Sequence, residues 1–181
     1  MIQLAGLHAL RVAGLLPGKQ VPGAGALVVQ GLVADTPAGL VLTDTGHARH
    51  AELLDAERAG ADLDAVAAAY ERFLALNGPV KALCSRWQRL GDGGLAERAV
   101  VLDELAELHE RLEPVLRRTV AALPRFAGYH DALGAALGHA RDGDRRWVTD
   151  PQIASYHSVW FRLHEDYLVT LGRDRQAEGS Y

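Results

Sequence analysis

The chain has 181 residues and a mild formal net charge of −4, so its length allows one domain or two small ones. Its one cysteine, Cys84, excludes an internal disulfide framework and a cysteine-rich zinc site, and it suits a reducing compartment. The apolar start lacks a basic flank and contains His8 and Arg11, and no run of about 18 uncharged apolar residues follows. We therefore expect a cytoplasmic protein without a secretory signal or a membrane span.

The first third of the chain predicts a helix, a break and a small hairpin. Apolar residues recur at helical spacing over 4–15, and the Pro- and Gly-rich stretch LPGKQVPGAG at 16–25 ends that helix. The sequence ALVVQGLVA at 26–34, the turn DTPAG and the run LVLT indicate strand, turn and strand, with a short helix as the alternative for the front part. Thr43 or Thr45 can cap the next helix, which ends near the stretch AGAD.

From Asp62 onward the pattern is wholly helical. The first helix, LDAVAAAYERFLAL, is predicted to end or kink at NGP, where Pro79 can occupy the first turn of the next helix, VKALCSRWQRL. The glycine-rich GDGG precedes the longest helix, whose apolar positions fall three and four residues apart between Leu102 and Leu123. Pro114 can bend that helix.

Two further helices complete the predicted fold. One follows Pro124, and Asp150 with Pro151 is predicted to cap the last helix, which runs to about Leu171. The sequence thus predicts a mainly α fold with one short β-hairpin.

The helix, the hairpin and the string LTDTGHARHAELL resemble the second half of a MarR-like winged helix, in which Leu42, Thr43 and Gly46 match the end of the wing and the start of the following helix. The strings YERFLALN, SRWQ, LPRFAGY and DPQIASYHSVWFRLHED resemble the helical domain attached to such winged helices in a group of actinobacterial proteins described as transcriptional regulators. This resemblance covers most of the chain. It implies a degenerate winged-helix domain at 1–60 and an α-helical domain at 61–181.

The region that would read DNA departs from that resemblance. A support helix, a turn and a recognition helix need roughly 25–30 residues, whereas the interval 16–31 offers about 16. No Lys or Arg occurs between Lys19 and Arg49, and Asp35 and Asp44 lie on or beside the predicted wing. Because DNA affinity depends largely on neutralised phosphates, we expect DNA binding to be lost.

Candidate catalytic residues cluster in the last helix. His157, Trp160 and His164 share one helical face, and Glu165 and Asp166 can orient the imidazoles. Either histidine could therefore carry a proton beside a substrate that contacts Trp160. The alternative is an aromatic packing face whose histidines bond to the backbone. We expect no metal site, because a seven-residue His spacing is not a known zinc pattern.

Candidate substrate-binding residues come from the other helices. Asn77 and Lys81 lie one turn apart, His109 interrupts an apolar seam, and Arg125 and Tyr129 can converge on the same cavity. Cations in a helical pocket suit a carboxylate, phosphate or sulfate. For His109 the alternative is a structural hydrogen bond.

The chain contains no phosphate-binding glycine loop, dinucleotide fingerprint or nucleophile elbow, so no cofactor is predicted. The first functional hypothesis is a winged-helix-derived scaffold that has lost DNA binding and binds a small polar or anionic metabolite, as a subunit of a biosynthetic enzyme of specialised metabolism. The second is a ligand-responsive MarR-like transcriptional regulator. The third is a structural subunit that contacts another protein chain through its apolar hairpin, as a homo- or heteromer.

Overall fold

The computed structural model describes residues 2–91 and 94–173 and confirms a mainly α fold with one short hairpin. The chain divides into two compact units. The first contains the described residues up to Ala61 together with those from Leu168 onward, and the second contains Asp62–Tyr167. Among the described residues, no helix combines the length and the apolar character needed to cross a membrane.

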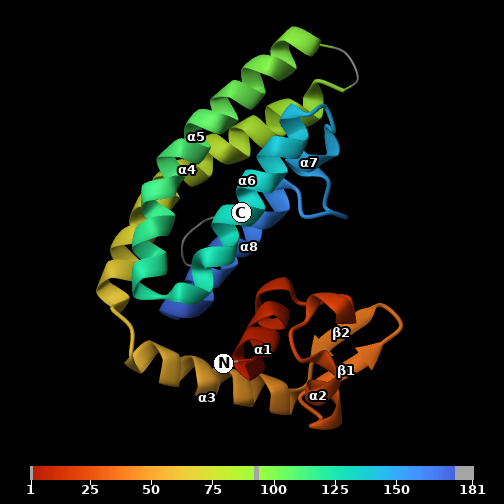
Figure 1. Ribbon diagram of the computed structural model, residues 1–181, viewed down its shortest axis with the longest axis vertical. Helices are drawn as coiled ribbons and strands as arrows, with labels where there is room; N and C mark the ends of the chain where they lie inside the picture. Colours follow the sequence, from red (N-terminus) through yellow and green to blue (C-terminus); the bar gives the residue numbers. More distant parts are fainter. Residues whose placement is uncertain (1, 92–93, 174–181) are drawn as a thin grey trace. The chain divides into compact units, whose positions relative to one another are not determined.

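The first unit begins with helix α1, Ile2–Ala13 (Figure 1). It is followed by the single 3-10 turn η1, Gly18–Gln20, and by the short helix α2, Ala24–Val29. The prediction of a strand over 26–34 is wrong for the front part of that range, which forms the short helix that the sequence analysis gave as the alternative. Seven apolar side chains from these segments and the hairpin form the core of this unit: Leu7, Leu10, Val21, Leu27, Leu32, Val33 and Leu40.

The hairpin consists of β1, Val33–Thr36, and β2, Gly39–Leu42, paired antiparallel. The hydroxyl of Thr36 donates to the carbonyl of Gly39 at 2.7 Å and closes the turn that DTPAG predicts. Leu16, from the segment before η1, pairs with Leu40 on the outer side of β2. One edge of the two-stranded sheet is thereby covered by the chain itself.

Helix α3, Asp44–Ala59, begins where the cap was expected. The hydroxyl of Thr43 accepts a hydrogen bond from the backbone N–H of Gly46 at 3.0 Å. A Cβ at Gly46 would lie 1.9 Å from the carbonyl oxygen of Leu32, so only glycine allows this approach.

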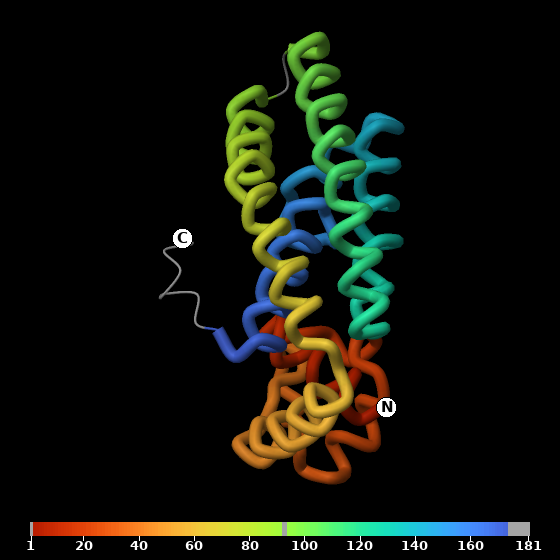
Figure 2. Tube along the Cα trace, turned by 90° about the vertical axis from the view of Figure 1, so that its left-hand side faces the viewer, coloured from red at the N-terminus to blue at the C-terminus, as the bar shows by residue number. Residues whose placement is uncertain are grey.

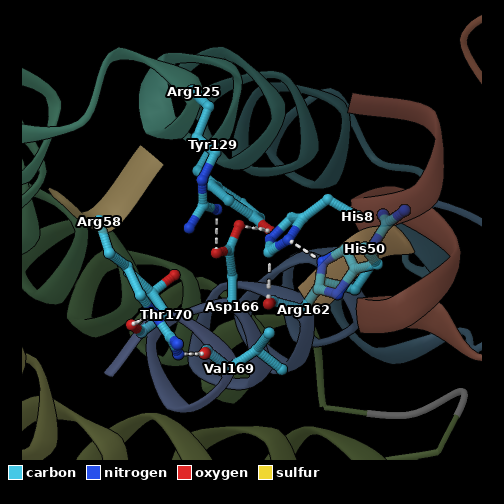
Figure 3. Close-up of polar contacts among 9 residues, drawn as sticks. All are labelled: His8, His50, Arg58, Arg125, Tyr129, Arg162, Asp166, Val169 and Thr170. Carbon is cyan, nitrogen blue, oxygen red and sulfur yellow. Dashed lines mark hydrogen bonds and ion pairs between the residues drawn. The ribbon is translucent and has the colours of Figure 1, made fainter. Parts of the chain in front are cut away.

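Near its other end, α3 binds the last turn of α8, Tyr156–Leu171. Nε and Nη2 of Arg58 donate to the carbonyls of Thr170 and Val169 at 2.7 and 2.6 Å (Figure 3). A cation at a helix C-terminus satisfies carbonyls that have no intrahelical partner. The described residues 168–173 are grouped with the first unit.

The second unit starts with α4, Leu63–Arg89, which is a single helix. The predicted end of a separate helix at NGP is wrong, because the helix continues through Pro79. Leu76, Val80 and Leu83 are buried on either side of that proline, while Pro79 itself is exposed. Burial of this continuous apolar face offsets the missing N–H of the proline.

Helix α5, Leu95–Ala122, runs beside α4, as both ribbon and tube show (Figure 2). The predicted seam is largely correct: Leu105, Leu112, Leu116 and Thr119 are buried. Pro114 lies within the helix and is exposed.

The remaining elements are η2, Pro124–Phe126, then α6, Ala127–Arg141, the short α7, Arg146–Thr149, and α8. The predicted cap at Asp150 is wrong. Its carboxylate accepts from the N–H of Gln152 at 2.8 Å in a local turn, and α8 starts only at Tyr156. The hydroxyl of Ser155 instead accepts from the N–H of Ser158 at 3.3 Å, as a capping side chain does.

Candidate functional site

The inner face of α8 is packed with aromatic rings. Nε2 of His164 lies 3.0 Å from the hydroxyl of Tyr70, and Nε1 of Trp160 donates to Oδ1 of Asn77 at 3.0 Å. The ring of Phe73 stacks on Trp160 with centroids 4.7 Å apart. Because His164 and Trp160 are both buried, this face has the structure of an aromatic core, the alternative that the sequence left open.

Arg125 and Tyr129 converge as expected, and the group on which they converge is Asp166 (Figure 3). Nη1 of Arg125 forms an ion pair with Oδ1 of Asp166, and the hydroxyl of Tyr129 donates to Oδ2 at 2.9 Å. Burial, and secondly the carboxylate of Asp166, raise the pKa of Tyr129 well above its ordinary value. A carboxylate of the chain itself therefore occupies the position that the sequence assigned to a substrate anion.

The other predicted residues lie at the surface of the second unit. His157 is half-buried, and burial followed by the charge of Lys81 lowers its pKa below 6.5. His109 is also half-buried, its Nδ1 lies 3.4 Å from the hydroxyl of Tyr156, and burial is the main effect that lowers its pKa. Glu165 is half-buried as well.

All nine predicted site residues therefore belong to the second unit. They are Asn77, Lys81, His109, Arg125, Tyr129, His157, Trp160, His164 and Glu165. The structure pairs Asn77 with Trp160 and joins Arg125 to Tyr129 through Asp166. Neither of the two grooves described next is lined by any of the nine.

A groove of about 430 Å³ lies between α4 and α5, and we call it the arginine groove. From α4 it is lined by Pro79, Ala82, Leu83, Arg86 and Arg89. From α5 it is lined by Glu104, Glu107, Leu108 and Arg111. Three arginines and two glutamates leave a surplus of one positive charge over an apolar floor.

Arg86 is the most constrained cation of the arginine groove. Its Nη2 lies 2.6 Å from Oε1 of Glu104, which makes an ion pair. The same nitrogen is shielded from solvent, and the carboxylate of Glu104 compensates its charge. In the part of the chain that the structure describes, Arg89 and Arg111 have no ion-pair partner. Within the described residues, the groove thus contains two guanidinium groups that are not ion-paired.

The sequence did not predict this groove. A signal was present, because Arg86 and Arg89 lie one turn apart, and Glu104 and Arg111 lie two turns apart on another helix. The side-by-side packing of the two helices, which brings these groups together, could not be read from spacing alone.

The second groove, of about 370 Å³, lies where α4 begins and α5 ends. Alanines form most of its lining, and Asp62 and Arg118 are its charged residues. Asp62 is already engaged as the cap of α4, accepting from the N–H of Ala65 at 2.9 Å. This lining offers a ligand fewer polar groups than the arginine groove does.

The first unit contains a buried histidine pair that the sequence did not predict. Nδ1 of His8 lies 2.9 Å from Nε2 of His50, and the rings stack with centroids 5.2 Å apart (Figure 3). One imidazole donates and the other accepts, so the pair joins α1 to α3. Because the two residues are 42 positions apart, local spacing gave no signal for this contact.

The described residues contain no group of three or more His, Cys, Asp or Glu side chains placed to hold a metal ion. Burial raises the pKa of the Cys84 thiol to about 12, so this cysteine is unreactive at neutral pH.

No protein-family model matches the chain, and neither the curated proteins nor the solved structures provide a match.

Proposed function

We propose that this protein is a winged-helix-derived scaffold that does not read DNA, and that its helical unit binds a small anionic metabolite in the arginine groove. The observation that carries the proposal is the surplus positive charge of this groove, in which, among the described residues, Arg89 and Arg111 have no ion-pair partner. An anionic ligand would accept charge-assisted hydrogen bonds from these guanidinium groups, and such bonds are roughly twice as strong as those between neutral groups.

The chemistry of the groove suits a carboxylate or a phosphate. A guanidinium presents a planar set of donors that match either group with two parallel hydrogen bonds. The apolar residues Ala82, Leu83 and Leu108 of the same lining would contact the carbon part of the ligand.

The surface of the first unit supports the loss of DNA reading. The exposed residues of α2 are Gly25, Ala26, Val28 and Val29, which have no side-chain donor or acceptor for a base edge. The chain provides no Lys or Arg between Lys19 and Arg49 to contact phosphates. A winged helix with such an α2 and hairpin lacks both the specific and the nonspecific contributions to DNA affinity.

We propose the binding of a ligand and no catalytic step. His164, one of the two predicted proton carriers, is buried against Tyr70 and Phe73. A catalytic role for His157 or Glu165, within a biosynthetic enzyme or otherwise, stays a prediction from the sequence.

The test is a calorimetric titration of the full chain with carboxylates and inorganic phosphate. We expect at least one anion to bind, and the substitution Arg86→Gln to weaken its binding by about tenfold or more. Arg117→Gln is the matched control, because Arg117 is an exposed arginine of α5 outside the groove. Absence of binding to every anion, or equal losses in both variants, would refute the proposal.

A second measurement examines the alternative function. We expect no retention of duplex DNA at low salt. Tight DNA binding that weakens steeply toward physiological salt would instead favour a ligand-responsive MarR-like regulator.

A further inference from the structure

The cations of the arginine groove lie toward its two ends. The ion pair with Glu104 places the guanidinium of Arg86 beside position 104 of α5. Arg111 is seven residues farther along the same helix, which corresponds to two turns or about 10 Å along the axis. Arg89, one turn beyond Arg86 on α4, lines the same groove. The groove therefore has separated positive charges and not a single cationic centre.

The middle of the groove disfavours an anion. Leu83 and Leu108 contribute an apolar surface there, and Glu107 lies between Glu104 and Arg111 on the same face of α5. A compact dianion held at the centre would approach the carboxylate of Glu107, and like charges at short distance repel. An extended ligand avoids that repulsion by keeping its charges at the ends.

We infer that the ligand of the arginine groove is an extended dianion, with a carboxylate at each end of an apolar chain. The carboxylate at one end accepts from Arg86 and the carboxylate at the other end accepts from Arg111. The apolar chain between them contacts Leu83 and Leu108. This inference rests on the proposed function and specifies its class of ligand.

The test uses three probes that differ in one property each. Suberate has two carboxylates and an extended chain that spans a distance comparable with two helical turns. Octanoate has the same number of carbons and one carboxylate, and succinate has two carboxylates close together. Binding of each probe to the full chain is measured by calorimetry at fixed ionic strength, because surface charges are screened by salt.

We expect suberate to bind about tenfold tighter than octanoate or succinate, as one further charged hydrogen-bonding group would give. Arg111→Gln should reduce suberate affinity to the octanoate level, whereas Arg117→Gln should leave suberate affinity unchanged. Circular dichroism spectra confirm that each variant is folded.

Equal affinities for suberate and octanoate, or suberate binding that is insensitive to Arg111→Gln, would overturn the inference while the binding of a monoanion through Arg86 still supports the proposed function. If no probe or other anion binds, the proposed function fails and the inference fails with it. The two failures are therefore distinguishable in one set of titrations.

Discussion

The ion pair between Arg125 and Asp166 gives the sharpest prediction for stability. The side chain of Asp166 is 4 % exposed and accepts from Arg125 and from the hydroxyl of Tyr129. Removing one partner of a buried pair typically destabilises a protein by about 3–5 kcal/mol. The guanidinium of Arg125 is 17 % exposed and the Tyr129 hydroxyl also donates to the carbonyl of Arg162 at 3.3 Å. We therefore expect Asp166→Ala to lower the free energy of unfolding by about 3 kcal/mol, at the low end of that range.

Urea unfolding followed by circular dichroism measures this change. Asp131→Ala is the control, because the Asp131 side chain is 92 % exposed and its partner is the neighbouring His130. We expect this control to change the free energy of unfolding by less than about 0.5 kcal/mol. A loss in Asp166→Ala that is no larger than the loss in Asp131→Ala would refute the assignment of Asp166 as a stabilising acceptor.

Three further predictions follow from steric fit, protonation and association. Gly46→Ala should lower the free energy of unfolding by about 1–3 kcal/mol, because its Cβ would meet the carbonyl of Leu32. Gly25→Ala has open space around it and should be neutral or stabilising by up to about 1 kcal/mol. Equal unfolding midpoints for the two variants would contradict the steric argument. Burial and the charge of Lys81 lower the pKa of His157 below 6.5, so the folded state binds this proton less readily than the unfolded state does, and stability falls as the pH drops below about 6.5. His157→Gln should make the plot of unfolding free energy against pH shallower between about pH 7 and 5, and an unchanged slope would exclude His157 as a contributor. The purified protein should sediment as a dimer or in complex with another chain because apolar side chains of the first unit are exposed, and a monodisperse monomer at micromolar concentration would count against association.

The parts of the fold that the sequence predicts are those with strong local signals. Thr43 caps α3 because a hydroxyl at that position reaches a free N–H within one turn, and the hairpin turn forms from residues that favour turns. The errors arise where distant packing decides. Pro79 does not end α4, because the buried face on both sides of it outweighs a local helix breaker, and Pro151 does not start α8.

The predictions for the candidate site also succeed where the signal is local and fail where the packing of distant segments decides. Spacing along α8 correctly placed Trp160 and His164 on one face, but the same spacing describes a ligand pocket and an aromatic core equally well. The deciding contacts come from Tyr70 and Asn77 on α4, and a single sequence without the packing of helices does not specify them. For Arg125 the sequence identified a buried cation that needs an anion, and the structure provides that anion from Asp166.

The binding of α8 by Arg58 has a consequence for how the chain can be divided or modified. The first unit is discontinuous in sequence, so a fragment that stops at Ala61 retains Arg58 and loses its acceptors on Val169 and Thr170. Conversely, a fragment that starts within the second unit can retain these carbonyls but loses the guanidinium that binds them. A recombination event therefore preserves the first unit only where the product keeps both segments of that unit, Arg58 on one and its two acceptors on the other.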